Sequence, residues 1–262
     1  MKHRMGFCAL AALLSCGDEA TVVIPSVRPP VVERCSESVP RTFEVYFILN
    51  VSGSMETFLT AMRDQLEAFA LGFPDVDVNG DRLLVDYYVI GFVNDHAFFP
   101  EGAARMTSSI AVAQAIQDAI DAATGDRNFD GSNNSERSEN MLDAVDAALD
   151  NISNADRKLF LIASLDPFAN QGERLLPNFT VQNAYADVRD RLQSSRADSF
   201  VYAFTNGDLE GFDRSYRGQA AIQADGLFDL GVLLGDTSGV GSILNQIAEE
   251  VACGDPDRGG SS

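Results

Sequence analysis

The chain has 262 residues, of which 45% are hydrophobic, and this suits one globular domain of ordinary core size with tails. Its 39 acidic and 19 basic residues give a formal net charge of −20. Such a charge argues against nucleic acid and anionic lipid headgroups as partners, because both are themselves negative.

The first residues are typical of an export signal. Lys2 and Arg4 give a positive start, and residues 5–14 form a short apolar run. This run is too short to span a membrane as a mature anchor. We therefore expect residues 1–15 to be a signal peptide of the lipoprotein type, removed when the protein is exported.

Residues 13–16, Leu-Leu-Ser-Cys, resemble a bacterial lipobox. The resemblance implies cleavage before Cys16 and lipidation of that cysteine. The lipid alone would then hold the protein at the cell envelope, on the outer membrane, its periplasmic face or the cell surface. Simple secretion after cleavage near Cys16 is the alternative. Residues 16–40 contain four prolines among short polar and β-branched residues, a composition typical of a tether.

Two further cysteines, Cys35 and Cys253, flank the expected folded part. In an exported protein, two remaining cysteines at opposite ends of one domain predict a disulfide. The sequence has no Cys-x-x-Cys pair or His/Cys cluster, so we do not expect a zinc site.

Apolar runs of strand length alternate with helical patterns from residue 41 onward. Residues 43–49 predict a strand, residues 55–73 a helix and residues 83–93 a second strand, with a short antiparallel edge strand at 96–100. The remaining predictions are helices at residues 108–123, 139–152, 181–194 and 240–251, strands at 159–164 and 199–204, a short apolar run at 227–234, and loops at 125–138 and 166–180.

Strands that are apolar almost throughout and alternate with helices indicate a mostly parallel sheet with helices on both faces. We predict a doubly wound α/β fold for one domain at residues 41–253, followed by a flexible tail at 254–262. In such sheets, ligands bind at the carboxyl ends of the strands. The loop after the first predicted strand, Asn-Val-Ser-Gly-Ser at residues 50–54, lies at that edge.

Three segments together resemble a von Willebrand factor type A domain over about residues 41–253. They are the Ser-Gly-Ser-Met loop at residues 52–55, the helix start Glu-Asn-Met-Leu-Asp-Ala at 139–144, and the ending Ile-Leu-Asn-Gln-Ile-Ala-Glu-Glu at 243–250. This resemblance implies a binding domain for a protein or surface ligand.

The same resemblance implies a metal-ion-dependent adhesion site, in which an Asp-x-Ser-x-Ser loop, a Thr and a later Asp hold Mg²⁺. Ser52 and Ser54 match the two family serines, whereas Asn50 stands in place of the Asp. Glu139 aligns with the Thr, and Asp166 is the nearest carboxylate after the fourth strand. Oxygen ligands of this kind suit a hard divalent cation. The alternative is a degenerate loop whose serines merely cap the following helix.

Two segments approximate the spacing of a calcium loop. Residues 75–80, Asp-Val-Asp-Val-Asn-Gly, have Asp86 as the closing acid, but we interpret them as a plain turn because Asp86 lies in a predicted strand. Residues 126–131, Asp-Arg-Asn-Phe-Asp-Gly, lack the closing acid. We interpret this second segment as a polar loop with weak affinity for calcium.

His96 is the only histidine after signal removal, and no nucleophile or phosphate-binding motif accompanies it, so we do not expect an enzyme. We predict an exported, lipid-anchored domain that binds a protein or cell-surface ligand, with Mg²⁺ or another divalent cation at the degenerate site. The alternative is a metal-independent structural or assembly subunit of an envelope complex.

Overall fold

The computed structural model describes residues 41–73, 82–124, 127–133, 139–166, 168–176, 179–195, 198–206, 211–212 and 214–253. The predicted signal peptide, tether and tail lie outside these residues, as do Cys16 and Cys35. None of the helices in the described ranges combines the length and the apolar character that crossing a membrane requires.

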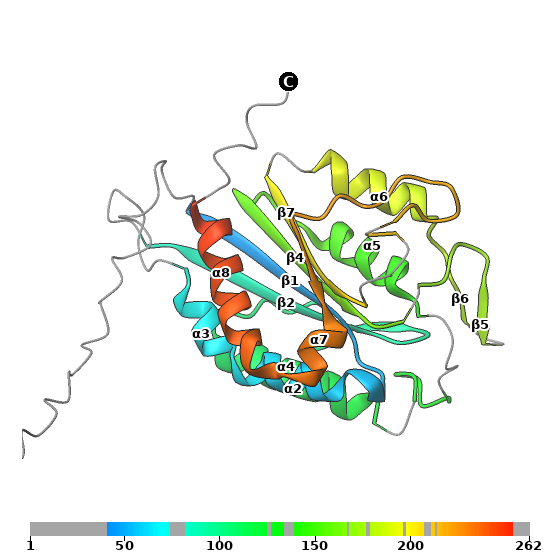
Figure 1. Ribbon diagram of the computed structural model, residues 1–262, viewed down its shortest axis with the longest axis horizontal. Coiled ribbons are helices and arrows are strands. Elements are labelled where there is room, and N and C mark those ends of the chain that lie inside the picture. Colours follow the sequence, from blue (N-terminus) through cyan, green and yellow to red (C-terminus); the bar gives the residue numbers. More distant parts are fainter. Residues whose placement is uncertain are drawn as a thin grey trace, which may run out of the picture.

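Six strands form one sheet in the order β3-β2-β1-β4-β7-β8, with β1 in the middle (Figure 1). The neighbouring pairs are all parallel except β2 and β3, which are antiparallel. The strands are β1 (Thr42–Asn50), β2 (Leu84–Phe92), β3 (His96–Phe99), β4 (Arg157–Ser164), β7 (Ser199–Thr205) and β8 (Gly226–Asp229). The predicted doubly wound α/β fold and its antiparallel edge strand are confirmed.

Helices cover both faces of this sheet (Figure 1). One face is covered by η1 (Gly53–Met55), α2 (Glu56–Asp64), α3 (Leu66–Leu71), α4 (Ser109–Ala122), α7 (Leu230–Gly235), η2 (Thr237–Gly239) and α8 (Val240–Cys253). The other is covered by α5 (Met141–Asn151) and α6 (Tyr185–Ser194).

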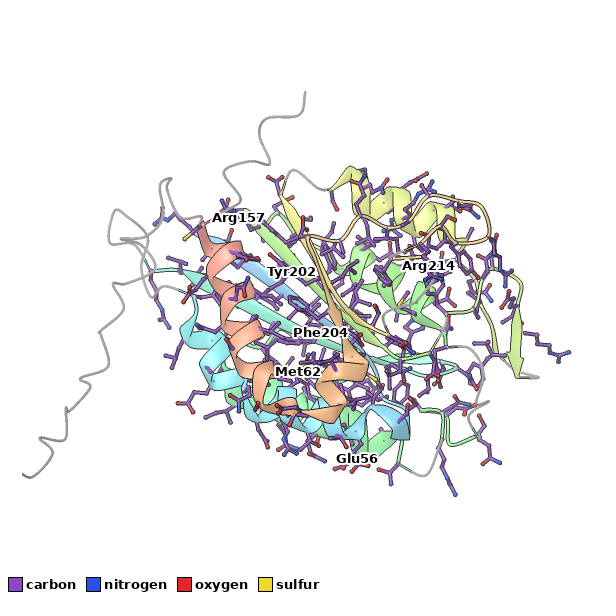
Figure 2. The ribbon with its side chains drawn as sticks, viewed as in Figure 1. Glu56, Met62, Arg157, Tyr202, Phe204 and Arg214 are labelled. Atoms are coloured by element: carbon purple, nitrogen blue, oxygen red, sulfur yellow. The ribbon has the colours of Figure 1, made fainter. Side chains whose placement is uncertain are left out.

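Alternation along each strand divides the core between the two faces, because successive side chains of a strand point in opposite directions. In β1, Val45 and Phe47 belong to the larger core, and Tyr46 and Ile48 to the smaller one. Figure 2 shows Tyr202 and Phe204 of β7 on the face that α7 and α8 cover.

The predicted helix at residues 55–73 is two helices in the structure. Gln65, with φ −103° and ψ 3°, interrupts it between α2 and α3. Both segments contact α4 and α8, but α2 packs mainly on α4 and α3 mainly on α8. The interruption therefore lets one amphipathic segment change its main packing partner from α4 to α8.

The predicted loop at residues 166–180 contains a small hairpin, β5 (Arg174–Leu176) paired with β6 (Phe179–Thr180). The hairpin extends to Val181, which bonds Gly172 and Glu173 through its backbone. For this reason α6 starts at Tyr185, four residues later than predicted. The apolar run at 227–234 likewise divides into β8 and α7, because the carboxylate of Asp229 accepts a hydrogen bond from Gly231 N at 2.8 Å and begins a helix.

Candidate functional site

Asn50 is the last residue of the central strand and lies at the carboxyl edge of the sheet. It is fully buried, between the ends of β2 and β4. Its Oδ1 accepts a hydrogen bond from Ser52 N at 2.8 Å, and its Nδ2 donates to Ser164 Oγ at 3.3 Å and to Asp166 Oδ2 at 3.5 Å. These contacts fix the orientation of the amide, so its nitrogen faces the carboxylate.

Ser52 and Ser54 place their hydroxyl oxygens side by side, 3.0 Å apart. Ser52 is buried and Ser54 is exposed, so the pair bridges the interior and the surface of this edge. Ser52 occupies the N-cap of η1 but makes no side-chain cap hydrogen bond, and the N-cap of α2 is Met55. The serines therefore do not cap the following helix, and the capping alternative is wrong.

Asp166 follows β4 and is partly buried. Its backbone oxygen accepts a hydrogen bond from Ser164 Oγ at 3.0 Å, which folds the segment back toward Asn50. Burial raises the pKa of the Asp166 carboxyl, and the hydrogen bond from Asn50 offsets part of this effect. Because burial disfavours the charged form of this carboxyl, a nearby positive charge would stabilise it.

Glu139 reaches the same edge by a different route than predicted. It precedes α5, which begins at Met141, and forms a parallel bridge with Phe168 instead of a helical turn. The backbone oxygen of Glu139 accepts a hydrogen bond from Ala169 N at 3.0 Å, and Asn140 N donates one to Val93 O at 2.7 Å. The chain at Glu139 is therefore held between the end of β2 and the segment after β4, and its side chain is 2% exposed.

These side chains fit a hard divalent cation in part. Hydroxyl and carboxylate oxygens are suitable donors for Mg²⁺ or Ca²⁺. However, Asn50 uses its oxygen on Ser52 N and turns its nitrogen to Asp166. Among the described residues no group of three or more His, Cys, Asp or Glu side chains could hold a metal, so a cation here would depend on the serine hydroxyls.

The calcium-like spacing at residues 75–80 lies outside the described residues, as does Asp126 of the second spacing. In the second spacing Asn128 is buried, and its Nδ2 donates to Ser132 Oγ and Asn133 O, both at 3.0 Å. Asp130 accepts from Ser132 N at 2.8 Å. The side chains of Asn128 and Asp130 therefore form hydrogen bonds within a compact turn.

Sequence reasoning missed a second set of polar side chains at the carboxyl edge, just after β2. Asp95 accepts hydrogen bonds from Phe129 N at 3.1 Å and Asp130 N at 3.3 Å, and burial raises the pKa of its carboxyl. It lines a hollow together with His96, Asn140 and Asp143. The available signal was the position of Asp95 in the short turn after a buried strand, where the same rule identified the loop at Asn50.

No family model matches the chain, and no curated protein matches it. Among solved structures it is similar to the von Willebrand factor type A protein from Catenulispora acidiphila, at 13% identity and a TM-score of 0.46, over 82% of this chain and 43% of that one. It is also similar to the vWF domain of the type V pili tip protein Mfa5 from Porphyromonas gingivalis, at 10% identity and a TM-score of 0.48, over 84% and 99%.

A third similar structure is proximal thread matrix protein 1 from the mussel byssus with a zinc-occupied MIDAS motif, at 16% identity and a TM-score of 0.45, over 82% and 48%. The chain thus spans less than half the length of the Catenulispora and mussel proteins. The strand order, the antiparallel edge strand and the serine loop after β1 agree with the resemblance found in the sequence. The chain therefore has a doubly wound α/β fold, and it is similar in fold to these von Willebrand factor type A structures.

Proposed function

We propose that this protein is an exported, lipid-anchored binding domain that holds a protein or cell-surface ligand through a divalent cation. The cation would be bound by Ser52, Ser54 and Asp166, with Glu139 nearby and Asn50 behind them. The observation that carries the proposal is the pair of serine hydroxyls 3.0 Å apart, of which Ser54 is exposed.

Charge supports this choice of cation and edge. The chain is strongly acidic, and burial raises the pKa of the Asp166 carboxyl, so a divalent cation would relieve a local electrostatic cost. A hard cation that takes two hydroxyls and one carboxylate from the protein keeps positions for water or for an incoming carboxylate. Mg²⁺ and Mn²⁺ are the cations to test first.

The second candidate is a metal-independent structural or assembly subunit of an envelope complex. One observation favours it: the amide of Asn50 already forms hydrogen bonds with Ser52 N, Ser164 Oγ and Asp166 Oδ2. A cation stabilises this loop less than it would stabilise a loop with an Asp at position 50. The amide of Asn50 already has hydrogen-bond partners, whereas a buried carboxylate there would need a positive charge.

Isothermal titration of the mature protein with Mg²⁺ and Mn²⁺ separates the two candidates. The binding proposal expects saturable heat that the double variant Ser52→Ala plus Ser54→Ala loses while its thermal unfolding in EDTA stays unchanged. Equal heats for the two proteins would favour the structural subunit. The anchor is a separate test: membrane fractionation should find the protein with membranes, and Cys16→Ala should release it or leave the precursor uncut.

A further inference from the structure

A hollow of about 370 Å³ opens at the carboxyl edge beside β3 and the start of α5. It is within the usual size range of ligand pockets, roughly 300 to 1,000 Å³. None of the five candidate metal-site residues lines it. Its lining residues are Asp95, His96, Asn140, Asp143, Phe179, Thr180 and Gln182.

Two carboxylates in this lining are fixed by backbone hydrogen bonds. Asp95 accepts from Phe129 N and Asp130 N, and Asp143 accepts from Gln182 N at 3.1 Å and from Asn183 N at 2.9 Å. In the part of the chain that the structure describes, no Lys or Arg forms an ion pair with Asp95 or Asp143. The hollow therefore carries two negative charges in fixed positions, with no positive side chain bound to them.

Asn140 provides an independent sign of a missing partner. It is 5% exposed and occupies the N-cap of α5, yet its side chain makes no cap hydrogen bond. Across the described ranges, no group donates a hydrogen bond to its buried Oδ1. Because buried acceptors in folded proteins nearly always have a donor, a water molecule or a ligand group in the hollow would supply the one that this atom lacks.

The remaining titratable group does not oppose a positive ligand. Burial lowers the pKa of His96 below its usual value, although Asp143, Asp95 and Asp146 act in the opposite direction. The imidazole therefore carries less positive charge than an exposed histidine at the same pH. A metal ion is a poor match for the hollow, because no group of three or more His, Cys, Asp or Glu in the described ranges could hold one.

We propose that this hollow binds the guanidinium or ammonium group of a basic side chain on a partner polypeptide. Several N–H donors on one cation can satisfy Asn140 Oδ1 and face both carboxylates at once. Guanidinium, with five donors in a planar fork, suits three acceptors on different walls better than a point charge does. This site is separate from the proposed metal site and requires no divalent cation.

The test is titration of the mature, isotopically labelled protein in EDTA with three small probes, followed by backbone amide NMR. The probes are N-acetyl-arginine amide, N-acetyl-lysine amide and N-acetyl-citrulline amide, the last being a neutral analogue of the first. We expect saturable shifts centred on Asp95, His96, Asn140 and Gln182 with the two cationic probes, and none with citrulline. Equal shifts with citrulline, or no saturable shift with either cation, would overturn the proposal.

Two variants locate the site. Asp95→Asn removes a charge and keeps one acceptor oxygen of the two that Phe129 N and Asp130 N use, and Asn140→Ala removes an acceptor that makes no bond in the protein. Each variant should lower the affinity for the arginine probe about fivefold. Asp118→Asn on α4 changes the charge by the same amount elsewhere and should leave that affinity unchanged. Unchanged affinity in both variants would refute the site even if one folds poorly. Binding of free spermidine alone, without either amino-acid probe, would refute a polypeptide partner.

Discussion

Asn50 and Asp166, which are 116 positions apart in the sequence, meet at the carboxyl edge of the sheet, where Asn50 Nδ2 donates a hydrogen bond to Asp166 Oδ2 over 3.5 Å. The contact replaces the pairing of carboxylate with cation that the sequence resemblance implies. It joins the loop after β1 to the segment after β4. The chemistry of this edge therefore depends on which group residue 50 presents to Asp166.

Replacing Asn50 with Asp should convert the edge into a stronger cation site. In the Asn50→Asp variant two carboxylates would face each other across the same gap, and their repulsion is relieved only by a cation or a proton. We expect Mg²⁺ or Mn²⁺ affinity to rise at least tenfold, about 1.4 kcal/mol, as measured by calorimetry.

Thermal unfolding provides the control for this variant, since a cation that binds only the native state raises the melting temperature with its concentration. Ser52→Ala plus Ser54→Ala in the Asn50→Asp background should abolish the rise. If Asn50→Asp is indifferent to millimolar Mg²⁺ and Mn²⁺, the serines and Asp166 do not form a metal site.

Asp166 predicts a defined pH dependence of stability. Burial raises the pKa of its carboxyl in the folded state, so the folded protein holds the proton more tightly than the unfolded chain. Stability from this group is therefore greatest at low pH and falls as the pH rises from its ordinary pKa, about 3.9, through the raised value. Asp166→Asn should be more stable than the wild type at pH 7 without added metal.

That gain should shrink as the pH falls through the raised value and then through the ordinary pKa of about 3.9, because Asp166 then becomes protonated in both states. Urea unfolding of the two proteins in EDTA at several pH values measures the difference. Asp95, Asp86 and Asp146 also have raised pKa values and contribute their own pH dependence, so only the difference between wild type and variant reports Asp166. A difference that does not change with pH would contradict the prediction.

Gly211 is a position where any side chain should destabilise the fold. Its φ is +104°, and a Cβ added there would collide with the ring of Phe168 and approach that of Tyr185. Gly211→Ala should lower the free energy of unfolding by roughly 3 kcal/mol, combining backbone strain with displacement of packed rings. Chemical denaturation measures the loss.

Gly218 is the matched control, because its φ is +82° but a Cβ there would meet nothing within 4 Å. Gly218→Ala should cost only the backbone strain, about 1 kcal/mol. Similar losses in the two variants would mean that the contact with Phe168 is unimportant.

The predicted disulfide between Cys35 and Cys253 also has a measurable consequence. Cys253 ends α8, while Cys35 lies outside the described residues. A bond that closes so long a stretch of chain would stabilise the protein by on the order of 5 kcal/mol in the chain-entropy model. Peptide mapping of oxidised protein should recover the linked pair, and a reducing agent should lower the melting temperature. Two free thiols in oxidised material would disprove the bond.

Patterns along the chain were sufficient for the strands and the sheet. Residues 43–49 are apolar except for Glu44 because β1 is covered on both faces, and this is visible without knowledge of any partner. The same periodicity did not reveal the break at Gln65, since both sides of it keep helical spacing. The break accompanies a change of main neighbour, from α4 for α2 to α8 for α3, which only tertiary contacts specify.

The candidate site divides in the same way. Sequence alone determined that Asn50 ends a strand and that Ser52 and Ser54 lie in the loop after it, because the rule that places loops at the carboxyl edge needs only the order of elements. Only the tertiary structure decided that Asn50 points its amide nitrogen at Asp166, that the serines face each other and cap nothing, and that Glu139 lies in a bridge with Phe168. Side-chain orientation at this edge depends on hydrogen bonds between segments more than a hundred residues apart, and no local pattern records those partners.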